Sequence, residues 1–206
     1  MKLILTSSIF LMFAIIVNVL AQTVPQSDPD KAKMDEIDQR MRNGDKAAVL
    51  EEANLRPDVV VPSLSIAARD KSTDPERVEL AREALSRVKG VEDYLKEKID
   101  QQSTRRDADA ADERYKQLDI LSMVRTNKAI RIIASYLFDD KTPGYDGGDY
   151  SIGPIRLEAA LLLDDMALAG APSNKPTNLK DHVLEWRTWW LRNHGKFDDA
   201  SPYRGK

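Results

Sequence analysis

The stretch from Ser151 to Ala169 constrains the fold most strongly, because apolar residues lie on two sides of the helix that it predicts. At about 100° per residue, one side carries Ile155, Ala159, Leu162, Leu163 and Met166. The opposite side carries Leu157, Leu161 and Leu168. A helix that is apolar on two sides has to be covered on both of them. The pattern therefore predicts a helix inside a stack of helices.

Further helices, joined by short turns, are predicted for most of the remaining chain. The run Thr73-Asp74-Pro75-Glu76 combines a capping residue, a first-turn proline and an early acid, and Thr126 is a second expected cap. We also expect Asp45 to cap a short helix, and we expect a helix over Val59 to Asp70 to carry Pro62 in its first turn. All predicted regular structure is helical, so the expected fold class is all-α.

Three leucines indicate an internal repeat. Leu85, Leu121 and Leu163 occupy comparable places in three predicted helices, at intervals of 36 and 42 residues. These intervals bracket the length of about 40 residues that is usual for a two-helix repeat. We therefore expect each leucine to lie near the end of the first helix of a repeat.

Two segments resemble the bacterial HEAT-like repeat family. Ile155-Arg156, followed by Glu158-Ala159-Ala160 and Leu163, is similar to the VR-x-x-A-A-x-A-L pattern of that family's first helix. Residues 129–139 are similar to its second helix, which ends in L-x-D, whereas the usual glycine after the first helix is replaced by Asp164-Asp165. The resemblance covers about residues 45 to 195. It implies a right-handed α-solenoid of antiparallel helix pairs whose second helices line a concave protein-binding surface, and it implies no catalytic residues.

The N-terminal segment predicts export. Residues 1–21 have the features of a signal peptide: Lys2 at the start, a mostly apolar run to Leu20, and Ala21 at the expected cleavage position. The alternative is an uncleaved membrane anchor, because the apolar run is close to spanning length. We expect a linker and an N-terminal helix over 22–44, the helical repeat domain over 45–198 and a polar tail over 199–206. The chain has no cysteine, which fits a periplasmic or secreted domain held by its core without disulfides.

Composition and motifs favour a binding protein over an enzyme. The net charge of −3 argues against a nucleic-acid partner, which needs a basic surface. No nucleophile elbow, phosphate-binding glycine loop or zinc motif is present, and His182 and His194 lie twelve residues apart. We expect no catalytic residues, cofactor or metal, and no membrane insertion after signal removal. The expected function is a non-catalytic interaction module for an unidentified protein. The alternatives are a structural envelope protein held by an uncleaved N-terminus, and an enzyme like the bilin lyases associated with some HEAT-like families.

The candidate site is the long connection 139–153, which enters the two-sided helix. Its glycines and its aromatic and acidic side chains suit contact with a partner. The residues expected to bind are Asp140, Tyr145, Asp146, Asp149 and Tyr150. Two other interpretations remain open: a solvated connector whose tyrosines pack back on the helices, and a calcium site, although the acids lack EF-hand spacing.

The last predicted helix carries three tryptophans, Trp186, Trp189 and Trp190. They suit a platform for a sugar or a peptide. They equally suit the covering of the exposed flank of a terminal repeat, and this second interpretation is favoured because a repeat array has to be closed at its ends.

Overall fold

The computed structural model describes residues 28–70, 74–147, 150–172 and 178–198, which are predominantly helical. The predicted signal peptide, residues 22–27 of the predicted linker and the predicted tail 199–206 lie outside these ranges. The elements are α2 (Pro29–Arg42), η1 (Lys46–Asn54), α3 (Pro57–Arg69), α4 (Pro75–Arg87), α5 (Val91–Gln101), α6 (Ala108–Val124), α7 (Asn127–Tyr136), β1 (Tyr145–Gly147), β2 (Tyr150–Ile152), α8 (Ile155–Asp165), α9 (Leu179–Asn193) and η2 (His194–Phe197).

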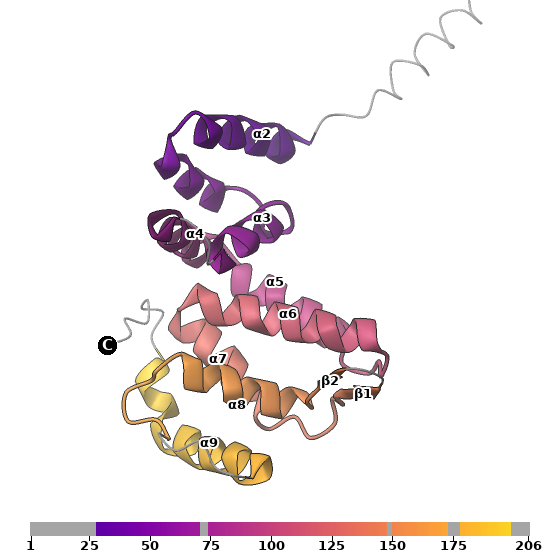
Figure 1. Cartoon of the computed structure of the whole chain (residues 1–206). Coiled ribbons are helices and arrows are strands. Elements are labelled where there is room, and N and C mark those ends of the chain that lie inside the picture. The colour runs from indigo at the N-terminus through magenta and orange to yellow at the C-terminus, as the bar shows by residue number, and fades with distance from the viewer. Residues whose placement is uncertain (1–27, 71–73, 148–149, 173–177, 199–206) are drawn as a thin grey trace, which may run out of the picture.

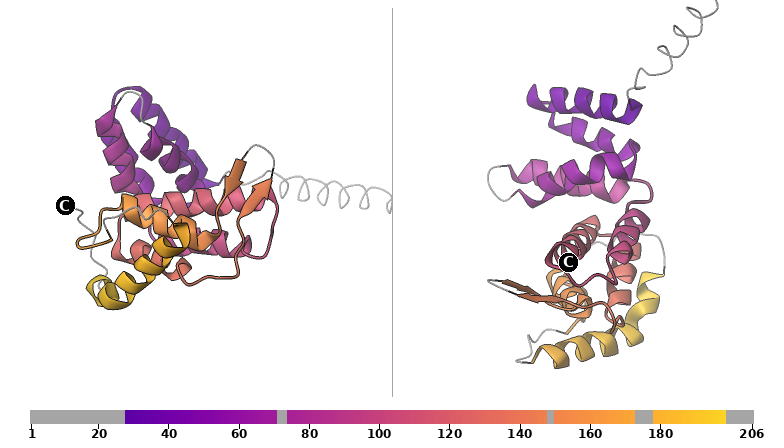
Figure 2. Two further views of the ribbon diagram at one scale, coloured as in Figure 1. Left: turned by 60° about the horizontal axis from the view of Figure 1, so that its bottom comes forward. Right: turned by 90° about the vertical axis from the view of Figure 1, so that its right-hand side faces the viewer.

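The helices form two layers that run the length of the molecule, from α2 at one end to α9 at the other (Figures 1 and 2). In one layer η1 packs on α4, α4 on α6, and α6 on α8. In the other layer α2 packs on α3, α3 on α5, and α5 on α7. Successive elements therefore alternate between the layers, and α9 follows α8 as the last helix of the stack.

The closest helix pairs differ from those expected from the leucine spacing. Leu85, Leu121 and Leu163 are all buried, as predicted. However, α4 and α6 pack more closely on the preceding helices α3 and α5 than on the following ones, whereas α8 packs about equally on α7 and α9. The turn between α4 and α5 is made by Gly90 at a φ of 77°, and these two helices contact each other little. The pairs that contain Leu85 and Leu121 are therefore shifted by one helix from the predicted pairs, while the predicted pairing of α8 with α9 is present.

Side-chain caps define several helix starts, and two of them confirm the sequence prediction. The Asp74 carboxylate accepts a hydrogen bond from the backbone N–H of Arg77 at the start of α4. The Thr126 hydroxyl accepts one from the backbone N–H of Ala129, at 3.1 Å, at the start of α7. In both cases the side chain satisfies a donor that has no partner within the helix.

The N-terminal helices differ from the prediction in two details. The segment Lys46–Asn54 is a 3-10 helix, and Asp45 does not cap it because the guanidinium of Arg40 binds that carboxylate at 2.7 Å. Helix α3 begins at Pro57, so Pro62 lies inside the helix rather than in its first turn. Pro57 takes the first helical position, where a missing N–H costs least.

The two-sided character of α8 is only partly realised. Its buried side holds Ile155, Ala159, Leu162 and Leu163, in contact with α6, α7 and α9. On the other side Leu157 is half-buried, but Leu161 is 39% exposed, and Leu168 is buried beyond the end of the helix. The second apolar side is therefore not covered along its length, in contrast to the prediction.

One hydrophobic cluster runs through the stack, from Val49 in η1 to Phe197 in η2. Trp186 and Trp190 belong to this cluster, which confirms that these two tryptophans cover the flank of α8. No helix within the described ranges has the length and apolar character needed to cross a membrane.

Candidate protein-interaction site

The long connection between α7 and α8 contains a β-hairpin, which the all-helical prediction missed. Strands β1 and β2 are antiparallel, with Tyr145 opposite Ile152, Asp146 opposite Ser151 and Gly147 opposite Tyr150. The sequence does hold a signal for this hairpin, because the dipeptide Gly-Asp at 148–149, between two short segments that begin with tyrosine, is typical of two-residue hairpin connections. Three-residue strands are too short to show the alternation that normally identifies a strand.

The first part of the connection is held by its own hydrogen bonds. The carboxylate of Asp139 accepts hydrogen bonds from the backbone N–H groups of Lys141 and Thr142 and from the Thr142 hydroxyl, the last at 2.6 Å. Partial burial raises the pKa of Asp139, but these hydrogen bonds outweigh it and the pKa is lowered overall. Because its carboxylate is used within the turn, Asp139 is a structural acid rather than a contact for a partner.

Asp140 connects the hairpin region to the last two helices. Its carboxylate lies 2.6 Å from the guanidinium of Arg187 in α9 and 3.7 Å from that of Arg156 in α8. The hydrogen bond from Arg187 lowers the pKa of Asp140. Arg187 also donates to the carbonyl oxygen of Leu137 at the end of α7, at 2.6 Å. The structure therefore separates Asp140, which is bound by arginines of α8 and α9, from the other residues of the predicted site.

A buried arginine fixes the connection to α6. Arg114 donates to the carbonyl oxygen of Pro143 at 2.8 Å and to those of Gln102 and Arg105 at 2.6 and 3.0 Å. A guanidinium presents several donors in a fixed plane, so one side chain can hold three carbonyl groups from two backbone segments. The role of Arg114 could not be predicted from the sequence, because nothing in its local pattern shows that distant carbonyl groups converge on it.

Glycines and a half-buried acid fix the second strand against the helices. A Cβ atom on Gly144 would lie 2.2 Å from the carbonyl oxygen of Ile152, so only glycine fits there. The backbone N–H of Gly153 donates to the carboxylate of Glu158 in α8 at 2.8 Å. Burial raises the pKa of Glu158, an effect that this hydrogen bond opposes. The base of the hairpin is therefore rigidly attached.

The hairpin itself projects from the side of the stack (Figure 2). Asp146 is exposed and forms no ion pair with the part of the chain that the structure describes, and Tyr145 is half-buried. Tyr150 contributes its backbone to β2, while Asp149 lies outside the described residues. Of the five predicted contact residues, the hairpin brings Tyr145, Asp146 and Tyr150 together. Asp140 and Asp146 are both exposed, but the carboxylate of Asp140 is bound by Arg187.

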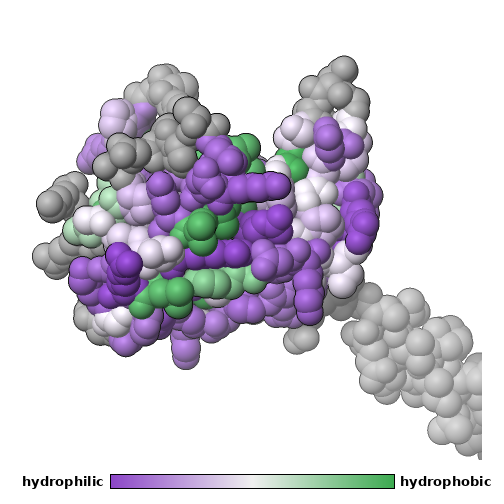
Figure 3. Space-filling view, turned by 90° about the horizontal axis from the view of Figure 1, so that it is seen from below, coloured by the Kyte–Doolittle hydropathy of each residue, from purple (hydrophilic) through white to green (hydrophobic). Residues whose placement is uncertain are grey.

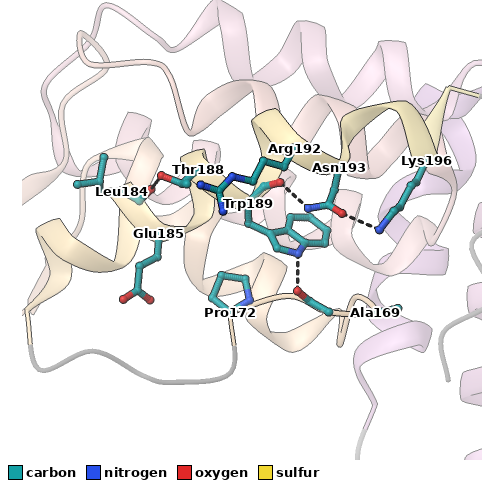
Figure 4. A pocket seen from close by; sticks show the side chains of 10 residues that line it. Ala169, Pro172, Leu184, Glu185, Thr188, Trp189, Arg192, Asn193 and Lys196 are labelled. Atoms are coloured by element: carbon teal, nitrogen blue, oxygen red, sulfur yellow. Dashed lines mark hydrogen bonds between the residues drawn. The ribbon is translucent and has the colours of Figure 1, made fainter.

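A groove also lies along α9, lined by residues from Leu184 to Lys196. It has a volume of about 630 Å³ and lies between α9 and the segment 169–172. The Trp189 indole N–H donates to the carbonyl oxygen of Gly170, and Arg192, Asn193 and Lys196 continue along the groove (Figure 4). Trp189 is half-buried, so it differs from Trp186 and Trp190, whose side chains are buried in the core.

Within the described ranges, no group of three or more His, Cys, Asp or Glu side chains is arranged to hold a metal ion. The calcium interpretation of the connection included Asp149, which lies outside those ranges. Two of the described acids of the connection have other roles: Asp139 closes a turn, and Asp140 binds two arginines.

No protein-family model matches the chain, and neither a curated protein nor a solved structure matches it. The comparisons therefore assign no family and no activity. What the protein does has to be argued from the geometry of its helices and of the projecting hairpin.

Proposed function

We propose that the chain is an exported, HEAT-like helical repeat protein that acts as a non-catalytic interaction module and binds another protein through its hairpin. The observation that carries the proposal is the hairpin of β1 and β2, which projects from the stack on a fixed base and presents an exposed acid. The export part of the proposal rests on the sequence of residues 1–21.

The packing of the helices within each layer supports a repeat architecture. Elements that alternate along the chain lie in two layers, and each helix of a layer packs on the next member of the same layer. This arrangement is what stacked two-helix repeats produce, because each repeat buries its apolar face on its neighbours. In such arrays, insertions between helices commonly carry recognition.

The attachment of the hairpin supports binding rather than a simple connector. Arg114, Asp139 and Glu158 all hold its base through hydrogen bonds to backbone or to Thr142. A rigid base lowers the conformational entropy that a loop loses on binding, so the hairpin is prepared for contact. Because Asp146 is exposed and acidic, the complementary partner surface carries a basic or hydrogen-bond-donating group.

Charge reversal at the hairpin tests this proposal. Asp146→Lys places a cation where we expect the partner's donor, and we expect about tenfold less partner to be captured from envelope extracts, equivalent to about 1.4 kcal/mol. Glu97→Lys is the matched control, because Glu97 is an exposed acid on α5 and lies outside the hairpin. Equal capture by both variants and the unmodified chain would remove the hairpin from the proposal.

A larger replacement makes the test independent of one side chain. Replacing residues 145–150 with a glycine-serine linker leaves Thr142 and Pro143, which anchor the connection, in place. We expect loss of the partner with retention of the helical circular dichroism signal.

The measured mass of the mature protein tests export: a species that begins after Ala21 supports it, and one that begins at Met1 contradicts signal cleavage.

A further inference from the structure

The outer face of α9 is apolar although α9 is the last helix of the stack. Leu184 and Leu191 lie on this face and are 61% and 64% exposed. The view from below faces this end of the molecule and shows apolar surface set among hydrophilic residues (Figure 3). A terminal helix of a helical array normally has a polar outer face, because that face meets water. The two exposed leucines therefore indicate that this face is covered by a partner.

The inner face of α9 fixes which residues point outward. Trp186 and Trp190 are buried against the core, and both the His182 ring and the Trp186 indole lie within hydrogen-bond distance of Asp164 in α8, at 2.7 and 2.8 Å. The helix therefore cannot rotate without breaking these contacts. Thr188 lies opposite the buried side and is exposed, with its hydroxyl bonded to the Leu184 carbonyl oxygen.

The outer face carries two rows that run along the helix on either side of Thr188. Leu184 and Leu191 form one row. Asp181, Glu185 and Arg192 form the other, roughly 90° away around the helix axis. The charged row is acidic toward the helix start and basic toward its end. Asp181 and Glu185 are four residues apart, which brings like charges together, and none of the three charged residues forms an ion pair within the described part of the chain.

We infer that this face binds a second copy of the chain, with the two α9 helices antiparallel about a two-fold axis beside Thr188. That axis keeps each row on its own side. It places Leu184 of one copy beside Leu191 of the other, and Glu185 beside Arg192, so the face is complementary to itself. A parallel pairing places the leucines of one copy against the charged row of the other. Because one helix from each copy forms the contact, the dimer is weak and reversible.

Cysteine crosslinking of the full chain tests this dimer, because the chain has no cysteine of its own. Thr188→Cys places one thiol beside the two-fold axis in each copy, so oxidation of intact cells with a copper–phenanthroline catalyst joins two chains by a disulfide. We expect a band of two chains on a non-reducing gel. Ser135→Cys is the matched control: Ser135 is also an exposed hydroxyl residue that bonds a carbonyl of its own helix, α7. We expect about tenfold less dimer for the control.

Charge exchange tests the antiparallel arrangement. In the Thr188→Cys background, Glu185→Arg places two cations together at both symmetry-related positions, and Arg192→Glu places two acids together. We expect each reversal to lower the crosslinked fraction about tenfold, and the double exchange Glu185→Arg with Arg192→Glu to restore it. Circular dichroism of each variant confirms that the helices are retained.

Three results would overturn the inference: equal crosslinking at 188 and 135, a crosslinked product that contains another protein, or a double exchange that fails to restore the dimer. The inference is independent of the proposed function. It uses the outer face of α9, and Asp146→Lys in the hairpin leaves that face intact, so the two proposals fail separately.

Discussion

Asp164 joins the last two helices through contacts that a local sequence pattern does not show. Its two carboxylate oxygens lie 2.7 Å from the His182 ring nitrogen and 2.8 Å from the Trp186 indole nitrogen. Both partners are buried, and the other ring nitrogen of His182 has no partner within the described residues. The acid therefore satisfies two polar groups that the core would otherwise leave without hydrogen bonds.

We expect Asp164→Ala to lower the free energy of unfolding by about 3 kcal/mol, because two buried groups lose their partner. Asp165→Ala is the matched control, since Asp165 is the next residue and is exposed. It should change the free energy by no more than about 0.5 kcal/mol. Urea unfolding followed by circular dichroism measures both, and similar losses for the two variants would show that Asp164 has no special role.

Glu52 is the least expected acid of the core, with 1% of its surface exposed. Burial, together with the nearby Asp38, raises its pKa from 4.5 to about 7, and Arg77 opposes the shift. One carboxylate oxygen has no hydrogen-bond partner among the described residues. Ionisation of Glu52 therefore destabilises the folded state.

The stability of the protein should depend on pH through this residue. In the unfolded chain Glu52 titrates near 4.5. Between pH 4.5 and about 7, Glu52 therefore holds a proton more strongly in the folded state than in the unfolded state. The free energy of unfolding then falls as the pH rises, by at most about 3 kcal/mol, and the loss is complete above about pH 7. Glu52→Gln removes the titration, so its stability relative to the native chain should rise between pH 5 and 8.

Urea unfolding at several pH values measures this difference. Glu97→Gln, at an exposed position, should follow the native chain at every pH. A difference between Glu52→Gln and the native chain that stays constant from pH 5 to 8 would show that Glu52 does not titrate in this range.

At the scale of elements, the hairpin depends on a backbone contact rather than on side-chain packing alone. Gly144 lies so close to Ile152 and Gly153 that a methyl group would meet backbone atoms at 2.2 and 2.6 Å. Backbone atoms cannot rotate away as a flexible side chain can. The position of the hairpin is therefore sensitive to this one residue.

We expect Gly144→Ala to displace the hairpin and to lower the free energy of unfolding by about 2 kcal/mol, because the added methyl group overlaps backbone atoms. Gly195→Ala is the control, since the nearest atom to its added Cβ lies 3.8 Å away. That change should stay within about 0.5 kcal/mol. If the proposed function is right, Gly144→Ala also weakens partner capture, whereas Gly195→Ala leaves it unchanged.

At the scale of the whole molecule, a single hydrophobic cluster connects the helices from η1 to η2. Ile133 is fully buried in α7, which packs on α5, α6 and α8. A charge at this position therefore disturbs the packing of helices on several sides. Leu161 on the neighbouring α8 is also an aliphatic residue, but it is 39% exposed, so it is a suitable control position.

Ile133→Asp should abolish the helical fold, because it places an unpaired carboxylate in the core at a cost of more than about 4 kcal/mol. The expected measurement is loss of the helical circular dichroism signal at neutral pH. Leu161→Asp should keep that signal and unfold cooperatively. Native-like melting of Ile133→Asp would contradict the position of Ile133 in the core.

The candidate site was predictable only in part. The connection 139–153 was identified from its glycines, acids and tyrosines, and the hairpin within it had a signal in Gly148-Asp149. The division of its acids could not be predicted, because Asp140 is bound by Arg187 from a helix that follows 47 residues later. Local sequence does not reveal which distant cation lies beside an acid.

The sequence by itself determined the helices, their approximate ends and which side of most of them is apolar. Asp74 and Thr126 cap helices because a side chain and backbone a few residues apart decide the outcome. Tertiary structure alone decided which helices pair closely, which buried groups Asp164 binds and which leucines of α9 stay exposed. Those features depend on contacts between segments far apart in the chain, and such contacts exist only once the helices are stacked.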